Sequence, residues 1–249
     1  MPYIAVTAST IMELSQLVKA TAAVPVELGH LQAFRGTVAG WEVLCAVTGI
    51  GKANAASATT ILLEREEIDL LVNIGCGGAF PGQGLSVGGL AIATSECFAD
   101  EGVLTPQGWH GLDLIGIPLF EYGGRPVFNT FELPGELATF SLQLARRLGL
   151  SAQKGPFLTV STCSGTSARA SELAAHYPGL CENMEGAAVA QMALLYGAPF
   201  LEVRGISNLV EDRDLSRWDL KGAVTAAQSF VLELLQAPLP LSRRQPFSR

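Results

Sequence analysis

The sequence predicts an α/β domain built in three layers, with helices on both sides of a mostly parallel sheet. Short apolar runs alternate along the chain with segments of helical periodicity, which is the pattern of strand–helix–strand units. One apolar run, residues 68–74, has the composition of a strand that is buried on both faces. Small residues stand at the joints between segments, where the chain must turn.

In the first part of the chain, strands are expected at residues 3–7, 41–47, 68–74 and 90–94. A helix is expected at 11–22 because apolar residues recur there at helical spacing, namely Ile11, Leu14, Leu17 and Val18. An Ala-rich helix is expected at 52–64, directly after Gly49-Ile50-Gly51.

The second part of the chain begins with residues 97–129, which are rich in Gly and Pro and only weakly periodic. A long loop region with a strand or two is expected there, and long loops in compact domains are often functional. A helix is expected at 134–148, because Pro134 stands near its start and Gly149 follows its end. The remaining expected elements are a strand at 157–161, helices at 167–176 and 184–196, a strand at 200–205 and a closing helix at 218–235.

Length and composition exclude several classes of protein. The chain has 249 residues, of which 49% are hydrophobic and 16% charged, so disorder is excluded as its main state. We expect a single domain over residues 1–236 and a loose tail over 237–249. The net charge of −7 argues against nucleic-acid binding, which needs a basic face. No apolar run approaches the about 20 residues of a membrane span. No basic segment precedes the first apolar run, as a secretory signal would require, so a cytoplasmic protein is expected.

Cysteine and histidine give no sign of a metal site or of a disulfide framework. The five cysteines are odd in number and far apart, and the three histidines are scattered. No Cys-x-x-Cys pair occurs. We therefore expect reduced thiols in a reducing compartment and no bound metal.

Four junctions that follow predicted strands carry residues capable of chemistry, and open α/β sheets place their sites at the carboxyl ends of strands. The first junction is residues 8–13, where Glu13 can act as a general base. The same residue fits a capping box, in which a glutamate three residues after Thr10 bonds back to the amide of the N-cap residue. The sequence leaves both roles open.

The other three junctions are weaker taken singly. Residues 73–79 contain three glycines that would let a ligand approach the backbone, although a plain tight turn fits them as well. Residues 182–188 start a helix with two carboxylates and a run of Gly and Ala, but acids also favour helix N-termini through the helix dipole. Residues 204–208 end a strand with Ser207 and Asn208, which are ordinary turn residues.

In their order along the chain, these motifs resemble those of one enzyme family. They are Gly49-Ile50-Gly51-Lys52-Ala53-Asn54-Ala55-Ala56, residues 73–78, Asn183-Met184-Glu185-Gly186-Ala187 and Val203-Arg204-Gly205-Ile206-Ser207-Asn208. The chain resembles the nucleoside phosphorylase/nucleosidase superfamily from its first strand to about residue 235. Within it, the chain is similar to the branch of the 5′-methylthioadenosine/S-adenosylhomocysteine nucleosidases and the futalosine hydrolases. The resemblance implies a three-layer nucleoside-phosphorylase-like fold, in which helices flank a mixed central sheet. It also implies a homo-oligomer, a dimer or larger, that needs no metal and no cofactor.

Within this superfamily, the residues after the first strand favour water over phosphate as the nucleophile. A phosphorylase must neutralise a phosphate dianion, usually with arginine. The turn Thr7-Ala8-Ser9-Thr10 contains no arginine, and Glu13 lies in the same region. A carboxylate repels phosphate and can take a proton from water, so hydrolysis is expected.

Two departures from the methylthioadenosine nucleosidases bear on the nucleoside. Those enzymes place Asp after their Arg-Ala-Ile-Ser motif, whereas this chain has Asn208, whose amide suits N7 and the 6-oxo group of a purine. Residues 161–166 also lack the Phe that those enzymes stack on adenine. Residues 99–106 and 208–213 look like those of futalosine hydrolases, and futalosine carries hypoxanthine.

The resemblance therefore implies hydrolysis of the N-ribosidic bond of futalosine to hypoxanthine and dehypoxanthine futalosine, in menaquinone biosynthesis. The alternative enzyme is an aminodeoxyfutalosine or methylthioadenosine/S-adenosylhomocysteine nucleosidase. A non-catalytic nucleoside sensor on the same fold is an alternative of a different class, and it would not need Glu13.

The resemblance also implies a role for each site residue. The catalytic residues would be Glu13, as the base for water, and Asn208, as the group that binds the purine while negative charge builds on it. Glu185 would hold the ribose hydroxyls, with Met184 packed on the sugar. The other residues expected to contact the substrate are Cys76, Gly78, Gly165, Thr166, Arg204 and Ser207. For the carboxyphenyl end of futalosine, Arg169 and residues 97–131 are candidates.

Overall fold

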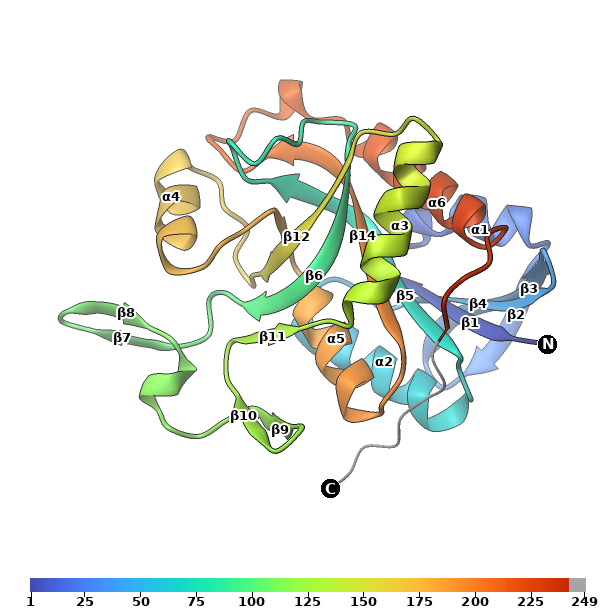
Figure 1. The fold of residues 1–249 in the computed structure, drawn as a ribbon, viewed down its shortest axis with the longest axis horizontal. Helices are drawn as coiled ribbons and strands as arrows, with labels where there is room; N and C mark the ends of the chain where they lie inside the picture. The colour runs from blue at the N-terminus through green and yellow to red at the C-terminus, as the bar shows by residue number, and fades with distance from the viewer. Residues whose placement is uncertain (242–249) are drawn as a thin grey trace.

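The structure, a computed structural model, describes residues 1–241 and is built around one ten-stranded sheet (Figure 1). The strands of this sheet are β1 (Tyr3–Ala8), β2 (Val24–Leu28), β3 (Leu31–Val38), β4 (Trp41–Val47), β5 (Leu70–Ala79), β6 (Leu90–Phe98), β11 (Thr130–Glu132), β12 (Ala152–Thr159), β13 (Cys181–Asn183) and β14 (Phe200–Leu209). Two small hairpins pair β7 (Val103–Thr105) with β8 (Gly108–His110) and β9 (Phe120–Tyr122) with β10 (Arg125–Val127).

The helices are α1 (Ser15–Ala20), α2 (Lys52–Arg65), α3 (Gly135–Arg147), α4 (Ser167–His176), α5 (Gly186–Leu195) and α6 (Leu220–Leu234). Three short 3₁₀ helices are η1 (Ile11–Glu13), η2 (Leu112–Leu114) and η3 (Leu215–Arg217). None of the helices within residues 1–241 combines the length and the apolar character needed to cross a membrane.

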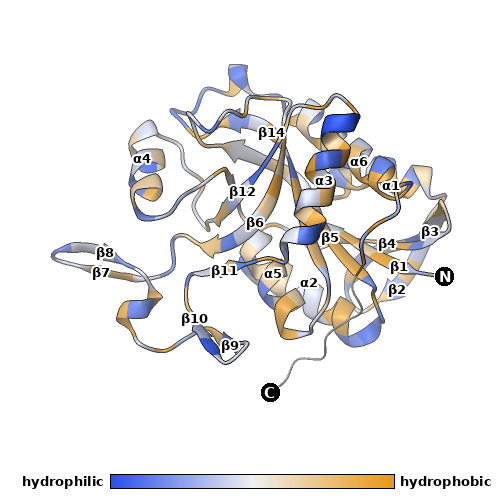
Figure 2. Cartoon of the chain, in the orientation of Figure 1, coloured by the Kyte–Doolittle hydropathy of each residue, from blue (hydrophilic) through white to orange (hydrophobic). Residues whose placement is uncertain are grey.

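Helices cover both faces of the sheet, which confirms the predicted three layers. Successive residues of β5 point to opposite faces, as in any strand, so Leu71 joins the core under α2 and α5 while Leu70 and Val72 join the core under α1, α3 and α6. Figure 1 shows α2 and α5 on one side of β5, with α3 and α6 on the other. The central strands β1 and β5 are largely hydrophobic in Figure 2, because neither of their faces meets water.

Part of the sheet closes on itself. β5 pairs with β14, β14 with β6, β6 with β12, β12 with β13, and β13 again with β5. The pairs β13–β5 and β14–β6 are antiparallel and the other three are parallel, so the sheet is mixed, as the resemblance implies. These five strands form a small barrel-like ring, and side chains that point into it are enclosed by backbone on every side.

Several elements differ from the sequence-based expectation. The helix predicted at 11–22 is divided into η1 and α1, because Glu13 turns its side chain back to the amide of Thr10 instead of continuing one regular helix. The strand predicted at 68–74 continues to Ala79, since its glycines pair with β14 and β13 rather than forming a turn. The hairpin of β2 and β3 and the short β13 were not predicted.

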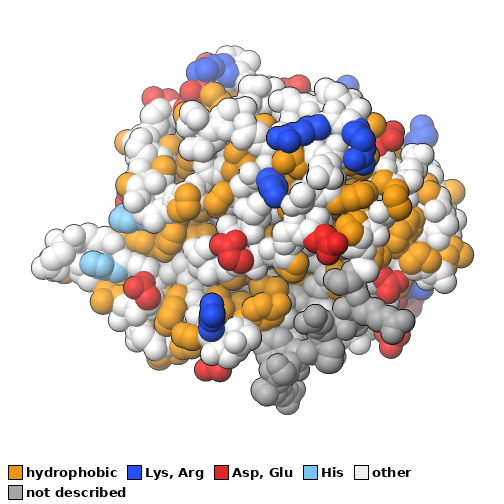
Figure 3. All heavy atoms as spheres, viewed as in Figure 1, with side chains coloured by type: hydrophobic (Ala, Val, Ile, Leu, Met, Phe, Trp, Pro, Cys, Tyr) orange, Lys and Arg blue, Asp and Glu red, His pale blue; other side chains and the backbone are white. Residues whose placement is uncertain are grey.

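The segment predicted as a long loop region forms the two small hairpins, which project from the body of the molecule beyond β6 (Figure 1). Two of its large apolar side chains are strongly exposed, Leu104 at 81% and Ile117 at 71%. In Figure 3, hydrophobic side chains reach the surface where this segment meets the body.

The end of the described chain packs against the body. After α6, Ala237, Leu239 and Leu241 are partly buried against the core formed with α1, α3 and α6. The rest of the predicted loose tail, residues 242–249, lies outside the described residues.

Candidate active site

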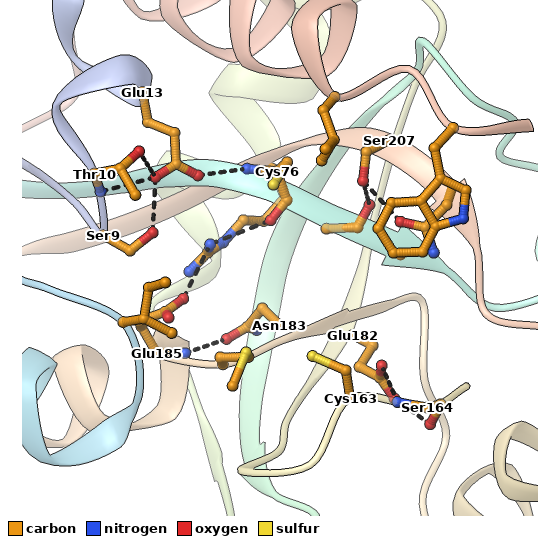
Figure 4. A pocket seen from close by; sticks show the side chains of 18 of the residues that line it. Ser9, Thr10, Glu13, Cys76, Cys163, Ser164, Glu182, Asn183, Glu185 and Ser207 are labelled. Carbon is orange, nitrogen blue, oxygen red and sulfur yellow. Dashed lines mark hydrogen bonds and ion pairs between the residues drawn. The ribbon is translucent and has the colours of Figure 1, made fainter. Parts of the chain in front are cut away.

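A pocket of about 360 Å³ lies where β1, β5 and β14 approach their carboxyl ends, beside the start of α5 (Figure 4). The four junctions singled out in the sequence meet here. Of the site residues that the sequence predicts, eight line the pocket: Glu13, Cys76, Gly78, Met184, Glu185, Arg204, Ser207 and Asn208.

Two of the predicted residues, Gly165 and Thr166, are not among those that line the pocket. The Thr166 hydroxyl instead accepts a hydrogen bond from the amide of Arg169 and caps α4. The Gly165 carbonyl accepts a hydrogen bond from the amide of Arg213. Both residues therefore make hydrogen bonds within the protein, and Cys163 and Ser164, from the same stretch, line the pocket.

Glu13 is 4% exposed, and its carboxylate is held by donors from two elements. Its Oε2 accepts hydrogen bonds from the Ser9 hydroxyl (2.7 Å), the Thr10 amide (3.0 Å) and the Thr10 hydroxyl (2.9 Å). Its Oε1 accepts a hydrogen bond from the Cys76 amide on β5 (3.1 Å). Glu13 therefore makes the capping contact and lines the pocket at once, and the two roles are compatible.

Arg204, on β14, is a buried cation at the floor of the pocket. Its Nε lies 2.8 Å from Glu202 Oε1, and its Nη1 lies 3.4 Å from Glu185 Oε2. Burial alone would lower the pKa of this guanidinium, but the surrounding carboxylates of Glu202, Glu185 and Glu13 raise it, so Arg204 is charged. Its Nη2 is buried and has no hydrogen-bond partner, which leaves a donor for a ligand or a water molecule.

A missing side chain on β5 makes room for this cation. A Cβ on Gly75 would lie 2.6 Å from Arg204 Nη1 and 2.7 Å from Glu13 Oε1. Only glycine fits there, and the carboxylate and the guanidinium converge on the space that the absent Cβ leaves.

Glu185 connects the start of α5 with the loop before α2. Its Oε1 accepts a hydrogen bond from the Gly51 amide (2.9 Å), and its Oε2 faces Arg204. The pKa of this carboxyl is raised overall, mainly by burial, although Arg204 and the Gly51 amide act to lower it. Asn183 holds the turn, because its Oδ1 accepts hydrogen bonds from the amides of Glu185 (2.9 Å) and Gly186 (2.7 Å).

Ser207 and Asn208 lie near the end of β14. The Ser207 hydroxyl lies 2.7 Å from Asn208 Oδ1, and Asn208 Nδ2 donates to the Leu209 carbonyl (2.9 Å). A Cβ on Gly78 would lie 3.1 Å from Asn208 Nδ2, so the two residues are in close contact.

Other lining residues were not predicted as site residues. From the sequence, Glu182 was noted only as an acid near the start of a helix. In the structure its carboxylate accepts hydrogen bonds from the Ser164 amide (2.9 Å) and hydroxyl (2.5 Å) and so holds the 161–166 stretch. Arg213 also lines the pocket, and its guanidinium stacks 4.5 Å from the centre of the Trp218 ring. Arg169, a candidate for the carboxyphenyl end, pairs with Glu172 and does not line the pocket. The remaining unpredicted lining residues are mostly apolar or small, and they are Ser9, Thr10, Met12, Ile50, Gly77 and Leu220.

The site contains carboxylates, a guanidinium and amides, and it offers no arrangement for a metal. Across residues 1–241, no group of three or more His, Cys, Asp and Glu side chains is placed to hold a metal ion. All five cysteines are free thiols. Burial raises the pKa of Cys76, the cysteine beside Glu13, to about 11, so this thiol is neutral at physiological pH.

Gly186 offers a test of how tightly the floor is packed. A Cβ there would lie 2.6 Å from both carboxylate oxygens of Glu202 and 2.7 Å from Glu96 Oε1. We expect Gly186→Ala to destabilise the fold by about 1–3 kcal/mol, because buried carboxylates must move, even though alanine is the better helix former. Urea unfolding measures the effect. Gly135→Ala is the matched control, since nothing lies within 4 Å of that position at the start of α3. Equal stabilities of the two variants would contradict the packing described here.

Comparison of the chain with known proteins identifies its family. The model of the phosphorylase superfamily matches residues 3–237. Futalosine hydrolase from Thermus thermophilus is 37% identical over 188 residues, covering 76% of this chain and 79% of that protein. Futalosine hydrolase from Streptomyces coelicolor is 35% identical over 201 residues, covering 78% of each.

Among solved structures, the 5′-methylthioadenosine/S-adenosylhomocysteine nucleosidase of Neisseria meningitidis in complex with methylthio-immucillin-A has a TM-score of 0.81 and 25% identity. The match covers 95% of this chain and 99% of that one. The extent of the family match and the identity of the relatives leave one conclusion: the chain belongs to the phosphorylase superfamily.

Proposed function

We propose that this protein is a nucleosidase that hydrolyses the N-ribosidic bond of futalosine, with water as the second substrate and hypoxanthine and dehypoxanthine futalosine as products. The relatives with 37% and 35% identity are futalosine hydrolases. The observation that carries the proposal is the placement of the Glu13 carboxylate in one pocket with the Glu185–Arg204 pair. A base for water and an anchor for a sugar are thus brought together.

Cleavage of an N-ribosidic bond passes through a transition state in which the ribose carries positive charge. Glu185 is the group that we assign to the ribose hydroxyls, because its carboxylate faces the pocket and is fixed from two sides by the Gly51 amide and Arg204. The negative charge of Glu185 also stabilises the positive charge that develops on the sugar.

Glu13 is the group that we assign to the attacking water. Donors fix its carboxylate through both oxygens, so its direction is set before a ligand arrives. Of the two arginines that line the pocket, Arg204 is already surrounded by carboxylates and Arg213 stacks on Trp218. A phosphate dianion would find little free positive charge there, and this favours water as the nucleophile.

Asn208 is the group that we assign to the purine. Its side chain lies at the pocket wall beside Gly78 and Ser207. The amide nitrogen carries two N–H donors. One donates to the Leu209 carbonyl, and the other can donate to N7 or to the 6-oxo oxygen of hypoxanthine, both of which are acceptors. Trp218 lies in the same wall and offers an aromatic face, although the 161–166 stretch has none.

A methylthioadenosine/S-adenosylhomocysteine or aminodeoxyfutalosine nucleosidase is the second candidate. A 5′-methylthioadenosine/S-adenosylhomocysteine nucleosidase from Halalkalibacterium halodurans, which is 29% identical over 73% of this chain, favours this candidate. We also propose that the protein acts in the cytoplasm, in menaquinone biosynthesis, as a homo-oligomer. Support for the oligomer comes from exposed apolar side chains in the projecting hairpin segment, which a second copy would cover.

A substrate panel tests the reaction directly. Futalosine, aminodeoxyfutalosine, methylthioadenosine and inosine are each mixed with the protein, with and without phosphate, and release of the free base is followed. We expect the highest kcat/KM for futalosine and no dependence on phosphate. A phosphate requirement would make the protein a phosphorylase, and binding without base release would make it a sensor.

Removal of the base at Glu13 tests the assignment of the water. Glu13→Gln keeps the shape and most of the hydrogen bonds, but an amide cannot take a proton. We expect kcat to fall about 10²–10⁴-fold while ligand binding, measured by calorimetry with a substrate analogue, stays close to wild type. Turnover near the wild-type rate would reduce Glu13 to its capping contact with Thr10.

Asn208→Asp tests the reading of the purine. A protonated Asp can still donate to N7, but the amide donor to a 6-oxo group is lost. Loss of one well-made polar contact in a buried pocket costs about 1–3 kcal/mol, or roughly 5- to 150-fold in rate. We expect the ratio of kcat/KM for futalosine over aminodeoxyfutalosine to fall by a factor in this range. An unchanged ratio would show that Asn208 does not read the base.

A further inference from the structure

Beneath the pocket, the strand ring encloses two carboxyl groups that the reaction described above does not use. Glu96 on β6 and Glu202 on β14 are both 0% exposed. Each has one oxygen with a partner: the Thr159 hydroxyl donates to Glu96 Oε2 (3.1 Å), and Arg204 Nε donates to Glu202 Oε1 (2.8 Å). Each also has one oxygen without any partner, Glu96 Oε1 and Glu202 Oε2.

The two oxygens without partners lie close to the same point, beside the Cα of Gly186. A Cβ on Gly186 would lie 2.6 Å from Glu202 Oε2 and 2.7 Å from Glu96 Oε1, so both atoms border the same point. Two buried carboxylates that face each other repel strongly, and each unsatisfied oxygen adds a desolvation cost. One proton held between the two oxygens removes both penalties, because it neutralises one group and gives each oxygen a partner.

We propose that Glu96 holds this proton and donates it as a hydrogen bond to the Glu202 carboxylate, and that the resulting pair positions Arg204 for its work in the pocket. The proton belongs to Glu96 because Arg204 makes its direct hydrogen-bonded ion pair, 2.8 Å long, with Glu202. Burial raises the pKa of Glu96 well above its usual value, and Glu202 raises it further, whereas Arg204 and the Thr159 hydroxyl lower it. Gly186 is glycine because the pair fills the place of its side chain.

The charged and titratable groups around Glu96 come from several elements. β14 provides Glu202 and Arg204, the start of α5 provides Glu185, and β13 provides the Cys181 thiol. Burial raises the pKa of Cys181, so this thiol is neutral. With Glu96 protonated, the Arg204 cation stands between two carboxylates, those of Glu202 and Glu185. The cluster then carries one net negative charge, which suits a reaction that builds positive charge on the ribose.

The hydrogen bond from Nε fixes the plane of the guanidinium. Because Nε donates to Glu202, Nη1 can donate to the Cys76 carbonyl (3.3 Å) and to Glu185, while Nη2 is buried without a partner. Glu202 is thus a positioning residue that acts through Arg204, and Glu96 keeps Glu202 in its charged, hydrogen-bonded form. The proposal deepens the hydrolysis proposed above and rests on it only for its effect on the rate.

The test compares two substitutions of similar shape at two equally buried positions. Glu96→Gln replaces the proposed O–H donor with an N–H donor, so we expect kcat within about twofold of wild type. Glu202→Gln removes the carboxylate that orients Arg204, and we expect kcat to fall on the order of 10-fold or more while KM changes less. Glu96→Leu has no donor and should behave like Glu202→Gln. Glu121→Gln, on the exposed strand β9, is the surface control.

The pH dependence of stability gives a readout that needs no substrate. An acid whose pKa is raised on folding stabilises the fold below its unfolded pKa, and this stability is lost as the pH rises towards the folded-state value. From the ordinary value of 4.5 upward, the Tm of wild type should therefore fall relative to that of Glu96→Gln. Infrared spectroscopy at neutral pH supplies the direct observation, a protonated-carboxyl C=O band that is present in wild type and in Glu121→Gln but absent from Glu96→Gln.

Two results would overturn the proposal. One is a folded Glu96→Gln variant that loses as much activity as Glu202→Gln, because Glu96 would then act as a charged group. The other is an infrared spectrum in which Glu96→Gln removes no protonated-carboxyl band. The infrared and thermal measurements involve no nucleoside. If the protein fails to hydrolyse futalosine, they still test the carboxyl pair, so failure of the proposed reaction can be told apart from failure of this proposal.

Discussion

The floor of the pocket depends on one buried cation, the guanidinium of Arg204. A charge removed from water must be paired and hydrogen-bonded, or the fold is destabilised by several kcal/mol. Glu202 and Glu185 provide the pairing, and the Cys76 carbonyl takes a further N–H. Much of the local sequence follows from this requirement. Gly75 leaves space for the guanidinium, Gly186 leaves space for the carboxyl groups, and both would clash if they carried a side chain.

The same constraint bears on Glu13, which makes a capping contact and to which we assign the attacking water. A carboxylate near a buried cation must be held in place, and the end of β1 does this with the hydroxyls of Ser9 and Thr10 and with the Thr10 amide. The capping contact shortens the first helical segment to a 3₁₀ turn, and it fixes the direction of the carboxylate. The capping contact and the proposed role as a base therefore require the same geometry here, which is why the sequence alone could not separate them.

The sequence predicted the layers, most helices and the meeting of the four junctions, because these follow from local periodicity and from the polarity of parallel strands. It did not predict the ring, since the antiparallel pairing of β13 with β5 joins residues about a hundred positions apart in ways that no local pattern records. Gly165 and Thr166 were expected at the ligand and are not among the residues that line the pocket, because Thr166 caps α4. A signal for the buried charges was present, because Glu202 and Arg204 are the two charged residues in the strand predicted at 200–205. Arg213 was missed because it lies in the charge-dense stretch 211–214, which is typical of a solvated loop, and Trp218 was missed because it was placed at the start of the closing helix expected at 218–235.

The pocket has a rigid half and a changeable half. The floor consists of residues from paired strands, whose backbone positions are fixed by neighbours on both sides. The rim includes Met12, Ile50, Trp218 and Leu220, all of which lie in 3₁₀ turns, loops or the first residue of a helix. Substitutions in the rim can alter which nucleoside fits without disturbing the groups to which we assign the cleavage. Directed evolution of new nucleoside specificities in this scaffold should therefore begin at the rim and keep the strand ring unchanged, and natural divergence between related enzymes can follow the same division.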